Sequence, residues 1–87
     1  MGSADEAMDQ LKVIVASLPG SRIVTAEDRY LHAEFRSTLL GFVDDLELLL
    51  DASTNLVHIR SASRMGHSDL GVNRQRVEGL VLKFEEQ

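Results

Sequence analysis

Residues 58–76 carry the residue types best suited to chemistry in this chain. The segment holds four arginines against one acid, together with small hydroxyl residues and two glycines. An arginine guanidinium binds a carboxylate or phosphate through two parallel hydrogen bonds, and the free N–H groups at a helix N-terminus also suit an anion. One hypothesis is therefore a site for an anion or an acidic peptide at a strand–loop–helix junction. Its candidate residues are Arg60, Arg64, Ser68, Asp69, Asn73 and Arg74.

The same arginines have a second interpretation as internal ion pairs. Charges on an otherwise apolar strand need partners, and two adjacent aspartates interrupt such a strand. The predicted structural ion pairs join Arg60, Arg64 or Arg76 to Asp44, Asp45 or Asp69. Ser68 or Asp69 would then only cap the helix that follows. We favour this structural interpretation, because structural ion-pair networks are common and a cluster of charged residues does not by itself indicate a functional site.

Catalytic and metal chemistry have weaker support. The chain has three histidines and no cysteine. A zinc site needs three or four converging ligands, and the spacing of His32, His58 and His67 is not diagnostic. His67, Ser68 and Asp69 are adjacent, whereas the members of a catalytic triad are brought together by the fold rather than by sequence. We therefore expect no enzymatic activity, no catalytic residues, no metal site and no cofactor.

Hydrophobic periodicity predicts the elements that position these residues. A capping box at Ser3 and Glu6 precedes apolar residues at helical spacing, while residues 30–36 alternate strictly between apolar and polar, as in a half-buried strand. Residues 42–50 fit a strand better than a helix, although both remain open. The predicted elements are a helix at 4–18, strands at 22–26, 30–36, 42–50 and 56–63, and a helix at 69–85.

These elements predict a single α+β domain over residues 1–87. Short connections favour an antiparallel four-stranded meander, and both helices have one apolar face, so both should cover the same side of the sheet. The opposite face would be polar, with Tyr30, His32, Glu34, Arg36, His58 and Arg60. Gly79 costs the last helix about 1 kcal/mol relative to alanine, and we expect it to permit close packing against the sheet.

Charge and hydropathy restrict the class of partner. The formal net charge is −5, which disfavours nucleic acid because such binding needs a basic surface. No apolar run reaches the ~18–20 residues of a membrane span, and the start of the chain does not resemble a signal peptide. We therefore expect a soluble protein, cytoplasmic by default, although a targeting sequence could lie in a longer parent chain.

Several runs in the chain resemble the domain of unknown function 1499 family. They are 30–37, Phe42-Val43-Asp44-Asp45, 60–64 with Gly66, Ser68-Asp69, 71–74 and Arg76-Val77-Glu78. The resemblance spans residues ~11–84, and the order of elements agrees with it. It implies a fold but no activity. Family members usually carry a further strand upstream, which implies that this chain is similar to the C-terminal part of the domain and leaves a sheet edge bare.

Three hypotheses for function follow. The first is a non-catalytic binding or assembly module, with an unknown protein partner or a homodimer joined through the edge strand at 22–26, because open edges accept another strand. The second is a binding domain for a small anionic ligand at the arginine-rich junction. The third is an enzyme of unknown reaction. Long unpaired edges would favour the first, unpaired arginines the second, and histidines and carboxylates gathered in a pocket the third.

Overall fold

A computed structural model describes residues 3–36, 42–64 and 70–86 of the chain. It confirms the predicted order of a helix, four strands and a helix. The elements are α1 (Ala4–Ser17), β1 (Ser21–Ala26), β2 (Tyr30–Arg36), β3 (Val43–Asp51), β4 (Leu56–Ser63) and α2 (Leu70–Glu85).

Local sequence sets both ends of α1. The Ser3 hydroxyl accepts a hydrogen bond from the Glu6 N–H, and the Glu6 carboxylate accepts one from the Ser3 N–H, so the predicted capping box is present. The helix ends at Ser17, and the chain reverses through Gly20, whose φ is +80°. A Cβ at Gly20 would lie 3.1 Å from the Arg36 carbonyl oxygen. Glycine therefore serves both the backbone conformation and the close approach to β2.

The four strands form one antiparallel sheet in the order β1-β2-β3-β4, so β1 and β4 are its edges. An irregularity between Ile23 and Thr25 interrupts the register of β1 against β2. The tight turn between β3 and β4 includes Asn55, which has a φ of 58° and whose Oδ1 accepts a hydrogen bond from the Ala4 N–H at 3.0 Å. This bond ties the start of α1 to the far end of the sheet.

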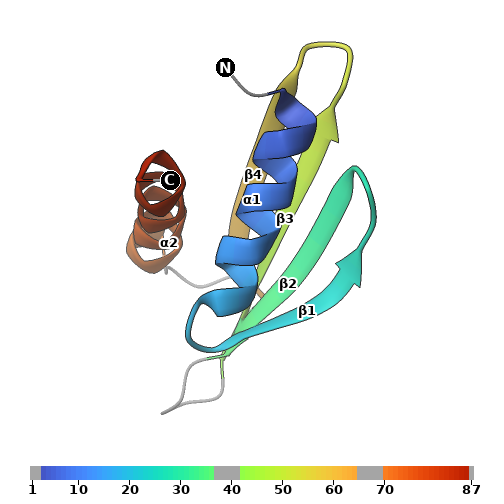
Figure 1. Cartoon of the computed structure of the whole chain (residues 1–87). Coiled ribbons are helices and arrows are strands. Elements are labelled where there is room, and N and C mark those ends of the chain that lie inside the picture. Colours follow the sequence, from blue (N-terminus) through green and yellow to red (C-terminus); the bar gives the residue numbers. More distant parts are fainter. Residues whose placement is uncertain (1–2, 37–41, 65–69, 87) are drawn as a thin grey trace.

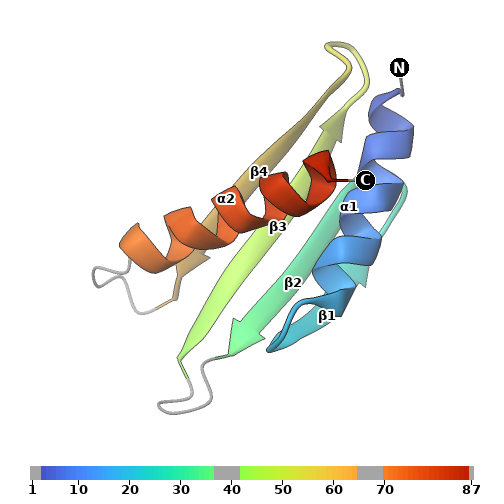
Figure 2. The same cartoon turned by 60° about the vertical axis from the view of Figure 1, so that its left-hand side comes forward.

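Both helices cover one face of the sheet, as predicted (Figures 1 and 2). α1 packs on β1, β3 and β4, while α2 packs on β4 and on α1. No helix in the described part of the chain lies over the other face of the sheet. The core lies between the helices and the sheet, and its largest fully buried side chains are Met8, Val15, Leu31, Leu46, Leu48 and Leu80.

The third strand is confirmed over the alternative helix, with bounds Val43–Asp51. One detail of the prediction was wrong. Gly79 does not serve close packing against the sheet, because a Cβ at this position would meet no atom within 4 Å. The proposed caps of α2, Ser68 and Asp69, lie outside the described residues.

Candidate functional site

The polar side chains of the sheet form two separate groups, one on each face. Successive side chains of a strand point to opposite faces, so Asp44 and Asp45 of β3 diverge. Asp45 lies on the face without helices and Asp44 on the face that carries the core. We call the first group the outer-face network; its residues are Arg22, Tyr30, His32, Glu34, Asp45, Glu47, Arg60 and Arg64. The second group, the inner cluster, consists of Phe35, Asp44, Ser61, Asn73 and Arg76.

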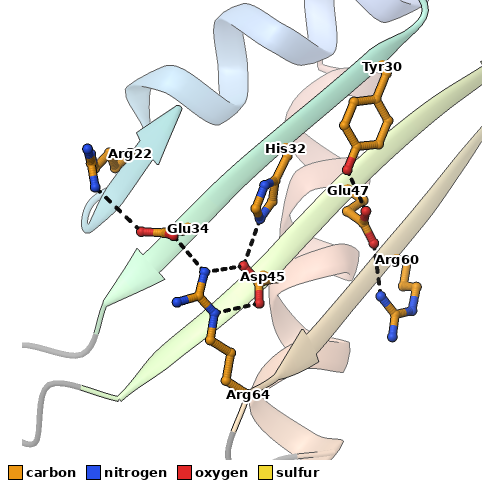
Figure 3. A network of polar contacts seen from close by, with 8 residues as sticks. All are labelled: Arg22, Tyr30, His32, Glu34, Asp45, Glu47, Arg60 and Arg64. Carbon is orange, nitrogen blue, oxygen red and sulfur yellow. Dashed lines mark hydrogen bonds and ion pairs between the residues drawn. The ribbon is translucent and has the colours of Figure 1, made fainter. Parts of the chain in front are cut away.

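Arg64 is the centre of one half of the outer-face network (Figure 3). Its Nε and Nη2 donate to the two oxygens of Asp45 at 2.8 and 2.9 Å. Nη2 also donates to Glu34 Oε2 at 2.6 Å, and Asp45 Oδ1 lies 2.7 Å from His32 Nε2. Arg22 extends the chain of contacts to β1, with its Nη1 3.8 Å from Glu34. One guanidinium at the end of β4 thus links carboxylates from β2 and β3.

These contacts change the acidity of the groups involved. The bidentate hydrogen bonds from Arg64 are the main cause that lowers the pKa of Asp45 to about 2, and the bond with His32 acts in the same direction. The hydrogen bonds to Asp45 and then to Glu34 raise the pKa of Arg64. Asp45 is therefore held as a carboxylate, which suits a structural acceptor and not a general acid.

The other half of the outer-face network is built around Glu47. The Tyr30 hydroxyl donates to Glu47 Oε2 at 2.5 Å, and Arg60 Nη1 donates to Oε1 at 2.9 Å. The bond to Glu47 raises the pKa of Tyr30, while the bonds from Tyr30 and then Arg60 lower the pKa of Glu47. Both shifts favour the neutral hydroxyl of Tyr30 beside the ionised carboxylate of Glu47.

The inner cluster joins α2 to the sheet. Arg76 Nη1 lies 3.0 Å from Asp44 Oδ2, donates to Asn73 Oδ1 at 2.9 Å, and approaches Ser61 Oγ at 3.3 Å. Ser61 Oγ also donates to Asn73 Oδ1 at 2.6 Å. The guanidinium carbon lies 4.6 Å from the centroid of the Phe35 ring, which is within the range of a cation–π contact. Asp44 and Asn73 are buried polar residues, so this cluster is an anchor inside the structure.

Two clefts flank α2. One, of about 280 Å³, lies between the start of α1, the β3–β4 turn and the C-terminal part of α2, and Ile59, Val81 and Phe84 line it. The other, of about 380 Å³, lies between the end of α1, β2 and α2. We call this second space the α2 cleft. Its walls include Phe35, Arg76, Gly79 and Lys83.

The described members of the predicted anion site do not come together. Arg60 and Arg64 lie in the outer-face network, whereas Asn73 belongs to the inner cluster on the other side of the sheet. Arg74 is exposed on α2, and Ser68 and Asp69 fall outside the described residues. The sheet thus separates the arginines of β4 from the residues of α2.

Two of the predicted structural ion pairs are present in the structure. Arg64 pairs with Asp45, and Arg76 pairs with Asp44. Arg60 pairs instead with Glu47, the residue opposite it in the β3–β4 register. Cross-strand neighbours lie close enough for such a pair. Without the register, the residue types alone do not identify Glu47 as the partner of Arg60.

Several partners were absent from the sequence-based set of site residues. Glu34, Glu47 and His32 complete the outer-face network, and Phe35 and Ser61 complete the inner cluster. Alternation in residues 30–36 did assign Glu34 and His32 to the polar face. The contact of His32 with Asp45 and the link that Arg64 makes between Glu34 and Asp45 depend on the β2–β3 register, in which Glu34 lies opposite Asp45.

Among residues 3–36, 42–64 and 70–86, no three or more histidine or carboxylate groups are placed to hold a metal ion. No helix in this part of the chain is long and apolar enough to cross a membrane.

Comparison with known proteins gives one match. A family model described as "Protein of unknown function (DUF1499)" matches residues 1–84, nearly the whole chain. No curated protein and no solved structure matches the chain. The family description states no activity, so any function must be argued from the geometry.

Proposed function

The chain belongs to the DUF1499 family, and on this premise we propose that it is a non-catalytic binding or assembly module that associates through the open edge of β1. One observation carries the proposal. The sheet ends at β1, and no other strand in the described part of the chain pairs with its free side. An edge strand presents unpaired N–H and C=O groups, which accept a strand from another chain.

The side chains of β1 support association at this edge. Ile23 and Val24 are 37% and 47% exposed, and β1 contains no proline. Arg22 is the only charged residue in the strand, and it points toward Glu34 of β2. The edge thus lacks the central charge and the proline with which proteins commonly prevent strand pairing.

The opposite edge is a poorer candidate. α2 packs against β4, and the side chain of Arg60 in the middle of β4 is 71% exposed. Two β4 strands related by a two-fold axis would bring two such arginines close together, and like charges across a strand pair are destabilising. We therefore assign the association to β1.

The simplest partner is a second copy of the chain. Two β1 strands can pair antiparallel about a two-fold axis, which gives a closed homodimer. Such pairing would join two sheets of four strands into one continuous sheet and would cover Ile23 and Val24. The paired state of Arg60 and Arg64 favours this role over an anion site made from these exposed arginines.

Light scattering across a concentration series tests the proposal. We expect the mass to rise from 9.6 kDa toward twice that value. Val24→Glu places a charge on the edge and should weaken association at least tenfold, while the free energy of unfolding changes by no more than about 0.5 kcal/mol. Val13→Glu is the matched control, because Val13 is 71% exposed and belongs to α1 rather than to the edge strand β1. A mass that stays at 9.6 kDa up to millimolar protein rejects the homodimer.

A further inference from the structure

α2 presents two adjacent stripes of side chains. Residues spaced by three and four share one side of a helix. Asn73, Leu80 and Phe84 form the stripe that packs on the sheet and α1. Val72, Arg76, Gly79 and Lys83 form the neighbouring stripe, and all four line the α2 cleft.

The α2 cleft combines an apolar floor with a positive rim. Phe35 and Leu80 belong to the hydrophobic core, and Leu18 packs against it; all three border the cleft. Arg76 and Lys83 are the ionisable residues among the described residues that line it, and no carboxylate belongs to that described set. This is unexpected in a chain of net charge −5. A ligand that fits must therefore be apolar at one end and anionic at the other.

Arg76 is held in a position to receive the anionic end. Its Nη1 makes the contacts to Asp44, Asn73 and Ser61, and its guanidinium lies over Phe35. Its Nε and Nη2 make no hydrogen bond to the residues that the structure describes. These two atoms form the edge of a guanidinium that binds a carboxylate through two parallel bonds. Asp44 balances the charge of Arg76, and Lys83, which makes no ion pair with a described residue, supplies the additional positive charge.

Gly79 keeps the cleft open. Glycine in the middle of a helix costs about 1 kcal/mol relative to alanine, and packing does not require it here, because a Cβ would meet no atom within 4 Å. Gly79 lies between Arg76 and Lys83 on the stripe that lines the cleft. A larger side chain would fill the space between the two cations.

We propose that the α2 cleft binds a small amphiphilic monocarboxylate. Its carboxylate contacts Arg76 and Lys83, and its short alkyl chain lies on Phe35 and Leu80. The cleft volume of about 380 Å³ is near the lower end of ligand pockets, which run from ~300 to ~1,000 Å³, so a short chain fits better than a long one. This site lies on α2 and is independent of the association through β1.

Octanoate is a suitable probe, and amide chemical shifts of the 15N-labelled chain report on its binding. We expect saturable shifts in the amides of residues 72–83 and of residue 35. Octanol, which lacks the carboxylate, should bind at least fivefold more weakly. Acetate, which lacks the alkyl chain, should cause no saturable shift. Equal binding of octanol and octanoate, or the absence of saturable shifts with octanoate, overturns the proposal.

Two variants locate the probe without removing the Asp44 anchor. Gly79→Leu should weaken octanoate binding at least tenfold, and its melting temperature should not fall, since leucine favours a helix more than glycine does. Lys83→Gln should weaken binding by up to about fivefold, as expected for an exposed ion pair. Val24→Glu, at the β1 edge, should bind octanoate like the wild type. Unchanged binding to the Gly79→Leu protein excludes this cleft as the site.

Discussion

Asp44 and Asp45 are neighbours in the chain, but the sheet places them in two different electrostatic environments. Asp44 meets Arg76 in the inner cluster, where the two side chains are 11% and 16% exposed. Asp45 meets Arg64 in the outer-face network, where the arginine is 47% exposed. Water solvates and screens the outer pair, whereas the inner pair depends on its protein partners. An aspartate–arginine pair should therefore contribute a different amount to the free energy of unfolding on each face.

The inner cluster joins α2 to the sheet, whereas the outer-face network joins no helix to it. Arg76 and Asn73 come from α2, Asp44 from β3, Ser61 from β4 and Phe35 from β2. The outer-face network stays within the sheet: most of its contacts join neighbouring strands, and the bond from Arg64 to Glu34 runs from the end of β4 to β2. Loss of the inner cluster should therefore loosen α2, while loss of the outer-face network should leave the architecture intact.

Asp44→Asn should have the largest effect of the changes that compare the two faces. The substitution keeps the size of the side chain and removes its charge, which leaves the guanidinium of Arg76 mostly buried without a carboxylate. Breaking such a pair costs about 3 kcal/mol of the free energy of unfolding. Urea denaturation at neutral pH measures this loss. A cost below that of the same substitution at residue 45 would contradict the assigned difference between the faces.

Asp45→Asn should cost about 1 kcal/mol at neutral pH, because solvent screens the outer pair. The change is chemically identical to the one at residue 44 and lies one residue away, so it is a matched control for the backbone position. Arg64 should keep its hydrogen bond to Glu34 in this variant. Amide hydrogen exchange should show little change in α2, whereas Asp44→Asn should accelerate exchange there.

The pH dependence of stability separates the faces further. Arg64 lowers the pKa of Asp45 to about 2, so the carboxylate contributes stability above its ordinary pKa and loses that contribution as pH falls through the lowered value. We expect the free energy of unfolding to fall between about pH 4 and pH 2, and about 1 kcal/mol of that fall to be absent in Asp45→Asn. If the free energy of unfolding fell equally with pH in the wild type and in Asp45→Asn, the stability of the outer-face network would not depend on the ionisation of Asp45.

Sequence patterns predicted the fold well because alternation and helical spacing are local signals. Alternation over residues 30–36 assigned His32 and Glu34 to the polar face, and the structure places them there. It also indicated that Asp44 interrupts an apolar face, which led to the expectation of a buried partner, and Arg76 fills that position.

The candidate site was harder to predict, because it depends on how distant strands align. The arginine-rich segment suggested one site, but β4 alternates, so Arg60 and Ser61 face opposite sides of the sheet. The choice of Glu47 as the partner of Arg60 follows from the β3–β4 register. The α2 cleft depends on the position of α2 against Phe35 and the end of α1, and no local pattern reports such packing.

The smallest expected effect concerns the pair of Arg60 and Glu47. The arginine side chain is 71% exposed and donates a single hydrogen bond to Glu47 at 2.9 Å. Exposed pairs of this kind contribute about 0.2–1 kcal/mol. A double-mutant cycle with Arg60→Gln and Glu47→Gln should give a coupling energy in this range, which should fall toward zero in 1 M salt, where the screening length is only ~3 Å. The Asp44 and Arg76 pair should keep most of its coupling in the same salt, because burial limits screening. If salt reduced both coupling energies equally, the two faces would be electrostatically alike. Any larger contribution of the inner cluster to stability would then come from the packing of Arg76 against Phe35.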